Sequence, residues 1–265
     1  MSRIETVFQT LQEKGEKALI GFLTFGCPSK ESTIALVEEM EKNGLDIIEL
    51  GIPYSDPLAD GETIKKASKQ AIESGIKVKD VFEGIAEIRK KSQIPIVLLT
   101  YFNTVFNYGV DRFFEKMKET GADGIIIPDL PLEEKAEITD AAKENAIDII
   151  PLVTKVSHSR IKSIVEDATG FVYCVSILGV TGARETIQGD LTDYMAEVRS
   201  ATKLPRAIGF GISNGETAKK WKDISEGVIV GSAFVKETLE PVSLEEMKER
   251  IVSKVKEIKL AINEK

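Results

Sequence analysis

Eight short apolar runs, each separated from the next by a charged amphipathic stretch, recur along the 265-residue chain. This alternation is typical of repeated strand and helix units that build a parallel sheet. Most of the runs are apolar throughout, as strands covered on both faces must be. The predicted strands are Ala18–Phe25, Asp46–Ile52, Ile94–Tyr101, Gly124–Asp129, Asp148–Val153, Phe171–Ser176, Arg206–Gly211 and Gly227–Val230.

Between these strands the sequence predicts helices with one apolar stripe and one charged face. They include Lys30–Lys42, Val110–Thr120, Leu132–Asn145, Ser159–Asp167, Leu191–Ala201 and Glu216–Lys222. A helix over Ile4–Lys14 precedes the first strand, and a long helix over Ser243–Ile262 closes the chain. Ser243 is the predicted N-cap of that last helix, with Glu246 completing a capping box.

No linker or shift in composition divides the sequence, so we predict one domain over residues 1–265. Eight strand–helix units in a chain of this length predict a (β/α)8 TIM barrel with an extra N-terminal helix. A doubly wound open sheet is the alternative, but no Gly-x-Gly-x-x-Gly follows a strand near the start. In a TIM barrel the loops after the strands carry the chemistry, so candidate residues are sought at the strand carboxyl ends.

Charge and cysteine content exclude several classes of protein. The formal charge of −8 argues against a nucleic-acid-binding surface or a polybasic membrane patch. Cys27 and Cys174 are far apart in the sequence, so neither a disulfide framework nor a zinc site is expected. The first residues lack an apolar signal core, and no run approaches the ~18 apolar residues of a membrane span. We therefore expect a cytoplasmic protein.

Glu49 is the strongest candidate for chemistry because it lies inside an otherwise apolar strand. Burial there would raise its pKa toward neutrality, which suits a general acid or base. A structural carboxyl, bonded to nearby backbone or a tyrosine, is the alternative. Asp60 follows one loop later and could either share a site with Glu49 or cap the next helix.

Glycine clusters follow the last three predicted strands, at Gly179–Gly182, Gly209–Ser213 and Val230–Phe234. Glycines let backbone N–H groups approach an anion, and Ser232 can begin a short helix whose N-terminus faces it. Phosphate sites of TIM barrels frequently lie at the seventh and eighth loops. The clusters therefore predict a phosphate site, with simple tight turns as the alternative.

Other polar residues carry weaker signals. His158 is the single histidine and precedes a predicted helix, where a solvated side chain is expected, so no catalytic triad or metal cluster is predicted. Lys155 follows the fifth strand and could form a Schiff base, although a solvated lysine is the alternative. The segment Gly179–Asp190 has the composition of either a closing lid or a surface loop.

Apolar and aromatic residues near the strand ends could line a pocket beside the phosphate loops or simply pack in the core. They are Phe22, Leu99, Tyr101, Ile126, Leu152, Tyr173 and Phe210.

With these residues assembled, the chain resembles the tryptophan synthase alpha subunit family over nearly its whole length. The motifs that occur in the family's order and spacing are Glu49–Gly61, Pro128–Pro131, Gly179–Gly182, Gly209–Ser213 and Val230–Ser232. This resemblance implies a carbon–carbon lyase of L-tryptophan biosynthesis. Such an enzyme cleaves indole-3-glycerol phosphate to indole and glyceraldehyde 3-phosphate by a retro-aldol step that needs neither a metal nor a Schiff base.

The resemblance also implies roles for individual residues. Glu49 would transfer protons, Asp60 would hold the indole N–H, and Thr181 would help to close the lid over Asp60. The apolar residues given above would receive the indole ring. The backbone N–H groups that would bind phosphate belong to Gly182, Gly211, Gly231 and Ser232.

A partner follows from the same resemblance: a pyridoxal-phosphate beta subunit in an α2β2 tetramer, with no cofactor in this chain. Pro53, Asp56, Pro57 and the Asn103–Phe106 region would face that partner. The sequence departs from the family's usual pattern at Phe25–Pro28, Glu62, Thr104 and Thr154–Ser157, and none of these changes removes a catalytic residue. Two other classes stay open from the residues alone: a Schiff-base aldolase that uses Lys155, and a non-catalytic phosphate-binding regulatory subunit.

Overall fold

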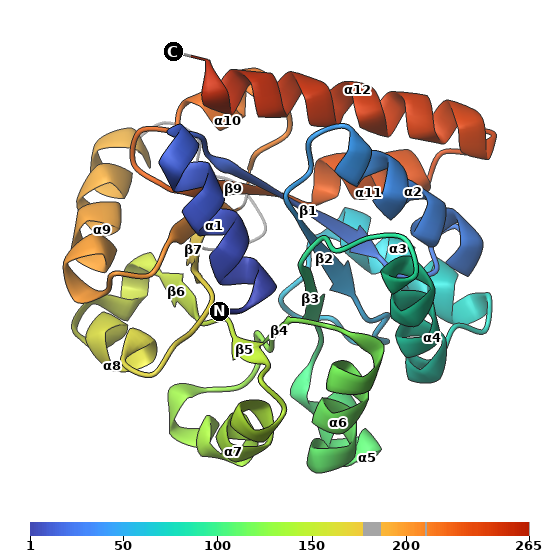
Figure 1. The fold of residues 1–265 in the computed structure, drawn as a ribbon, viewed down its shortest axis with the longest axis horizontal. Helices are drawn as coiled ribbons and strands as arrows, with labels where there is room; N and C mark the ends of the chain where they lie inside the picture. The colour runs from blue at the N-terminus through green and yellow to red at the C-terminus, as the bar shows by residue number, and fades with distance from the viewer. Residues whose placement is uncertain (177–186, 210, 265) are drawn as a thin grey trace.

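A ring of parallel strands surrounded by helices forms the molecule (Figure 1). The computed structural model describes residues 1–176, 187–209 and 211–264. Within these residues nine strands form one sheet in the order β5-β4-β3-β2-β1-β9-β8-β7-β6. Their bounds are β1 Ala18–Thr24, β2 Ile47–Gly51, β3 Ile96–Leu99, β4 Gly124–Ile126, β5 Asp148–Ile149, β6 Leu152–Thr154, β7 Val172–Val175, β8 Arg206–Gly209 and β9 Gly227–Val230.

The predicted fifth strand, Asp148–Val153, is divided in the structure into β5 and β6. The break falls at Ile150 and Pro151, and proline has no N–H to donate to a neighbouring strand. The two residues still join the flanking strands: Ile150 N donates to Ile125 O at 2.9 Å, and Tyr173 N donates to Pro151 O at 3.0 Å. The divided strand therefore connects β4 to β7 and closes the predicted TIM barrel.

Helices cover the outside of this barrel. Their bounds are α1 Arg3–Lys14, α2 Lys30–Lys42, α3 Glu62–Glu73, α4 Val78–Arg89, α5 Phe102–Tyr108, α6 Val110–Thr120, α7 Ala136–Glu144, α8 Ile161–Val165, α9 Ile187–Ala201, α10 Gly215–Lys219, α11 Ser232–Thr238 and α12 Leu244–Asn263, with 3-10 turns η1 Leu132–Glu134 and η2 Lys155–Arg160. The bounds of α2 and α6 are those that the sequence predicted.

Several other predicted helices have different bounds in the structure. The predicted helix Leu132–Asn145 divides into η1 and α7, and Ser159–Asp167 corresponds to the end of η2 and a shorter α8.

The predicted lid Gly179–Asp190 lies outside the described residues up to position 186, and its last four residues belong to α9.

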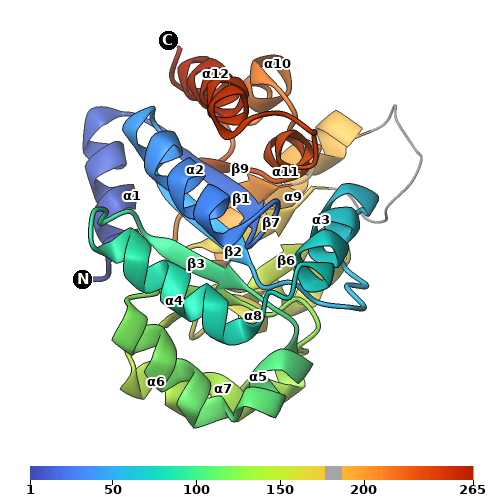
Figure 2. The same cartoon turned by 90° about the vertical axis from the view of Figure 1, so that its right-hand side faces the viewer.

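The N-terminal helix closes one end of the barrel. Ile4, Phe8 and Leu11 of α1 are buried in a cluster with side chains of the barrel interior, and the Phe8 ring lies 5.7 Å from that of Phe171. Ser2 and Glu5 form a capping box that fixes where α1 begins. Because Figure 2 shows α3, which follows β2, at the opposite end from α1, the carboxyl ends of the strands remain available for a site.

The capping box predicted for the last helix forms only in part. Ser243 Oγ accepts a hydrogen bond from Glu246 N at 3.2 Å, as an N-cap does. The Glu246 carboxylate instead accepts from Arg250 Nη2 at 2.6 Å, one helical turn further on. No helix in the described part of the chain is long and apolar enough to span a membrane.

Alternation along β2 places its glutamate inside the barrel. Ile47 belongs to the interior cluster, whereas Ile48 and Leu50 belong to the cluster between the strands and the outer helices. Since side chains two residues apart point to the same face of a strand, Glu49 points inward with Ile47. The fold thus presents one carboxyl to the interior near the open end.

Candidate active site

Glu49 is buried in the barrel interior, with only 2% of its surface exposed. It pairs in register with Phe22 of β1 and Val97 of β3, and its Oε2 has no hydrogen-bond partner in the described structure. Burial, with a smaller contribution from the charge of Asp60, raises the pKa of the Glu49 carboxyl to about 8. Glu49 therefore retains its proton at neutral pH. Its side chain lines a cavity.

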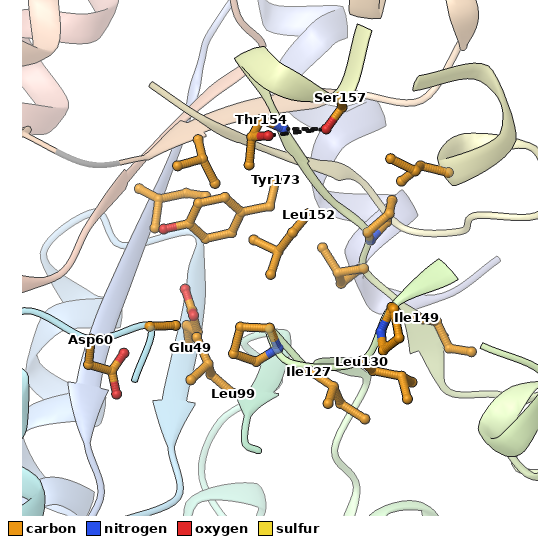
Figure 3. Close-up of a pocket in the computed structure, with 18 of the residues that line it drawn as sticks. Glu49, Asp60, Leu99, Ile127, Leu130, Ile149, Leu152, Thr154, Ser157 and Tyr173 are labelled. Atoms are coloured by element: carbon orange, nitrogen blue, oxygen red, sulfur yellow. Dashed lines mark hydrogen bonds between the residues drawn. The ribbon is translucent and has the colours of Figure 1, made fainter. Parts of the chain in front are cut away.

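Asp60 lies on the same side of the cavity as Glu49, at the end of the loop that leads into α3 (Figure 3). Burial raises its pKa to about 6, while a hydrogen bond with Tyr101 and the charge of Lys65 act in the opposite direction. Asp60 is not the helix cap: Gly61 occupies the N-cap position of α3, without a side-chain hydrogen bond. The two carboxyl groups thus differ in protonation near neutral pH, with Glu49 protonated and Asp60 ionised.

Tyr101 supports the loop that carries Asp60 through hydrogen bonds. Its hydroxyl accepts a hydrogen bond from Ala59 N at 3.0 Å and also bonds with the Asp60 carboxylate. The Tyr101 ring stacks on that of Tyr54, with centroids 4.8 Å apart and an interplanar angle of 17°. Tyr101 is buried and is not among the residues that line the cavity, so the structure places it as a support for Asp60.

A cavity of about 860 Å³ opens beside the two carboxyl groups. Eight of the predicted site residues line it: Phe22, Glu49, Asp60, Leu99, Leu152, Tyr173, Gly231 and Ser232. Ile126 is fully buried in the interior cluster instead and does not line the cavity. Gly211 also lies away from the cavity lining, and Thr181, Gly182 and Phe210 fall outside the described residues.

The start of α11 forms one wall of this cavity. Gly231 is the N-cap residue, and Ser232 is the first residue of the helix. The first intrahelical bonds run from Phe234 N and Val235 N to Gly231 O, so the N–H groups of Ser232 and Ala233 precede them. Such early N–H groups have no partner within their own helix and suit an anion.

The structure disfavours Schiff-base chemistry at Lys155. The neighbours Thr154, Val156 and Ser157 line the cavity, but Lys155 does not. His158 is exposed, with its Nδ1 3.7 Å from a carboxylate oxygen of Glu197. No group of three or more potential metal-binding side chains is found in the part of the chain that the structure describes.

Sequence reasoning missed part of the lining. Ile64 lies on α3, and Ile127, Pro128 and Val175 lie at or beyond the ends of β4 and β7. The positions of Ile127 and Val175 at the carboxyl ends of strands would have indicated them, because these ends meet at the open end of the barrel. Ile64 offered no comparable signal, since an apolar helix residue is more often part of the core.

A TIM barrel whose cavity combines two carboxyl groups, an apolar lining and a helix N-terminus has the features of an enzyme active site. The comparisons with known proteins identify the particular family. A model of the family described as "Tryptophan synthase alpha chain" matches residues 8–263, and the chain belongs to that family.

Individual relatives agree with this assignment. The tryptophan synthase alpha chain of Caldanaerobacter subterraneus subsp. tengcongensis is 50% identical over 264 residues, covering 100% of this chain and 99% of the relative. That of Alkaliphilus metalliredigens is 48% identical, covering 98% of each chain. The crystal structure of tryptophan synthase subunit alpha from Legionella pneumophila has a TM-score of 0.90 at 30% identity, covering 99% of this chain and 98% of that one.

Proposed function

We propose that Glu49 carries out the proton transfers of the reaction that this family performs, the cleavage of indole-3-glycerol phosphate in tryptophan biosynthesis. The observation that supports this role is the burial of Glu49. A carboxyl with a pKa of about 8 retains its proton at neutral pH and faces the cavity. General acid catalysis requires a protonated group within reach of the substrate.

Glu49 alone can serve as both the acid and the base of the retro-aldol step. The protonated carboxyl gives its proton to C3 of the indole ring, which makes the ring electron-poor. The bond between C3 and the glycerol side chain then breaks, and its electron pair returns to the ring. The adjacent side-chain hydroxyl becomes the aldehyde and gives its proton to the Glu49 carboxylate, so that the acid is regenerated.

Asp60 is proposed to stabilise the positive charge that develops on the ring. Its pKa of about 6 leaves it ionised at neutral pH, so its carboxylate can accept a hydrogen bond from the indole N–H. An ionised Asp60 also favours the protonated form of Glu49, because the charge of Asp60 contributes to the raised pKa of that residue. The charge of Asp60 therefore helps to keep Glu49 protonated.

The cavity walls suit the two ends of the substrate. Phe22, Leu99, Leu152 and Tyr173 supply apolar surface for the indole ring. Gly231 and Ser232 place a helix N-terminus for the phosphate group. We propose that Thr181 and Phe210 also bind the indole and that Gly182 and Gly211 also bind the phosphate. Tyr101 would contribute to indole binding through Asp60, and Ile126 through its packing in the interior cluster.

A beta subunit carrying pyridoxal phosphate is the proposed partner, in an α2β2 complex. Two large apolar residues near the carboxylate loop are exposed, Leu58 at 77% and Phe106 at 66%. A hydrogen bond of 3.3 Å from Asn103 Nδ2 to Tyr54 Oη links α5, which carries Phe106, to the loop that carries Leu58. An exposed apolar surface of this kind supports an interface over Pro53, Asp56, Pro57 and Asn103–Phe106.

The role of Glu49 is tested by a Glu49→Gln variant, with indole release measured in the isolated chain and with a beta subunit added. We expect kcat to fall by about 10²- to 10⁴-fold, the range typical of general acid–base catalysis. Glu62→Gln is the matched control, because Glu62 is a solvent-exposed glutamate beside Asp60. Full activity of Glu49→Gln would eliminate the proposed role.

The competing Schiff-base reaction has its own test. Borohydride added with substrate would attach the substrate covalently to Lys155 if a Schiff base formed there. We expect intact-protein mass spectrometry to show the unmodified chain. A stable adduct on Lys155 would replace the proposed mechanism.

A further inference from the structure

The lining of the large cavity comes from two different faces of the barrel strands. Glu49, Leu152 and Tyr173 line it from the interior face, and we call this part the inner chamber. Ile127 and Ile149 also line it, yet both pack with the cluster between the strands and the outer helices. The cavity therefore continues from inside the barrel to the layer outside its strands.

We call this outer part the outer lobe and define it by Ile127, Leu130, Ile138, Ile149 and Ile164. All five side chains are apolar and are buried or half-buried. Figure 3 shows Leu130 and Ile149 across the cavity from Glu49 and Asp60. The outer lobe is thus separate from the carboxyl pair that the mechanism uses.

The divided strand explains why the cavity can pass between the two layers. β5 ends at Ile149 and β6 begins at Leu152, so Ile150 and Pro151 interrupt the wall there. The surrounding helices separate at the same place: α7 packs on α6 and β5, whereas α8 packs on α9, η2 and β6. Ile138 of α7 and Ile164 of α8 both line the cavity there.

Two positively charged side chains lie at the edge of the outer lobe. Lys135 precedes α7 and Arg160 ends η2, and both line the cavity. Arg160 Nη2 lies 2.8 Å from Glu133 Oε1, which offsets its charge, while no salt bridge to Lys135 is found among the described residues. Val156, which is 67% exposed, adds apolar surface at this edge. An apolar molecule with one negative group matches this lining.

The cavity extends beyond the residues that the proposed substrate uses. Small-molecule sites typically span about 300–1,000 Å³ for ligands of drug size, and 860 Å³ lies toward the top of that range. The indole and phosphate ends of the proposed substrate are both accounted for by residues of the inner chamber and the start of α11. The outer lobe therefore remains available when the inner chamber is filled.

We propose that the outer lobe is a second binding site, for a small apolar monocarboxylate, that is occupied independently of the reaction site. The hydrocarbon part contacts the isoleucine and leucine side chains, and the carboxylate pairs with Lys135. This site goes beyond the proposed function, because none of its defining residues has a role in the retro-aldol step.

The experiment is an isothermal titration of 3-phenylpropionate into the full-length chain, repeated with indole and glycerol 3-phosphate present at saturation. We expect the dissociation constant to change by less than about twofold when the inner chamber is filled. Uncharged 3-phenylpropanol is the matched ligand control and should bind at least about fivefold more weakly, since it cannot form an ion pair with Lys135.

Three variants locate the site. Ile164→Trp fills the outer lobe and should weaken binding at least about tenfold, while indole release stays within about twofold of the wild type. Lys135→Gln should weaken binding about fivefold, with Lys143→Gln, at an exposed position of α7, as its control. Val156→Asp places a negative charge at the exposed edge and should also weaken binding, even if Ile164→Trp fails to fold.

Three results would overturn the proposal. The first is loss of 3-phenylpropionate binding when indole and glycerol 3-phosphate are present, which would assign the ligand to the inner chamber. The second is unchanged binding in both Lys135→Gln and Val156→Asp. The third is an absence of binding to the wild-type chain at millimolar ligand.

Discussion

The two ends of the barrel treat buried carboxylates in opposite ways. At the end closed by α1, Asp123 accepts hydrogen bonds from Arg3 Nη1 at 2.7 Å, Arg89 Nη2 at 2.6 Å and Ile96 N at 2.8 Å. At the open end, Glu49 is also buried but has an oxygen without a partner in the described structure. Paired buried charges hold the structure together, whereas an unpaired carboxyl keeps its proton and remains reactive.

The pattern at the closed end repeats around the barrel. Asp46 precedes β2 and accepts from Lys259 Nζ at 2.6 Å and from Leu19 N at 2.6 Å. Glu226 precedes β9 and pairs with Arg206 at the start of β8. These pairs tie a strand to its neighbour or to α12 at positions where the chain enters the barrel.

Asp148 is the exception at the closed end. It begins β5 and is buried, but its Oδ2 has no partner in the described structure. Burial raises its pKa, while hydrogen bonds with Ser2 and Thr169 act in the opposite direction. The closed end therefore stabilises most of its acids by pairing, and the contrast with Glu49 is strongest for Asp123.

Removing a paired acid should have the largest effect on stability. We expect Asp123→Ala to lose about 3–5 kcal/mol of unfolding free energy, because it leaves two arginines without their buried partner. Urea unfolding followed by circular dichroism measures this loss. Asp140→Ala, at an exposed position of α7, should change stability by less than about 0.5 kcal/mol. Equal effects of the two substitutions would contradict the pairing argument.

Removing the unpaired acid should make stability less dependent on pH. The pKa of Glu49 is about 8 in the folded chain and near 4.5 when unfolded, so the folded state binds more protons between these values. The unfolding free energy of the wild type should therefore fall as pH rises from about 4.5 to 8, on the order of a few kcal/mol. Glu49→Gln should lack this contribution. Parallel pH–stability curves for the two proteins would be inconsistent with a raised Glu49 pKa.

The reaction rate should depend on both carboxyl groups at the open end. Activity needs Asp60 ionised and Glu49 protonated, so kcat/KM should rise through about pH 6 and fall through about pH 8. Asp60→Asn should retain some activity and lose the acidic limb of this profile. A profile that keeps both limbs in Asp60→Asn would assign the acidic limb to another group.

The smallest effect is expected from the residue that supports Asp60. Tyr101→Phe removes a hydrogen bond that holds the pKa of Asp60 down, so the acidic limb should move to higher pH. We expect kcat/KM at neutral pH to fall by about 100-fold at most, because one hydrogen bond to a charged group is worth about 1.5–3 kcal/mol. Tyr108→Phe, on α5, is the control and should leave the profile unchanged. An unshifted limb in Tyr101→Phe would mean that Tyr101 does not support Asp60.

Local patterns in the sequence predicted the barrel and the position of Glu49. The apolar runs and amphipathic stretches act within a few residues, so α2 and α6 have the predicted bounds. The same reasoning failed where local and distant interactions compete. Pro151 interrupts a strand that was predicted to be continuous. Asp60, whose position in the sequence suits a helix cap, forms a hydrogen bond with Tyr101 and does not cap α3.

What the sequence by itself determined is therefore the order of strands and helices and the single acid placed on an inward face, because periodicity alone decides these. The tertiary structure decided which acids are paired, which pKa values are raised and where the cavity extends beyond the barrel wall. Those properties depend on residues far apart in the chain, as when Arg3 reaches Asp123 or Ile138 and Ile164 line one space. Burial and charge act through space, and only the folded chain defines those distances.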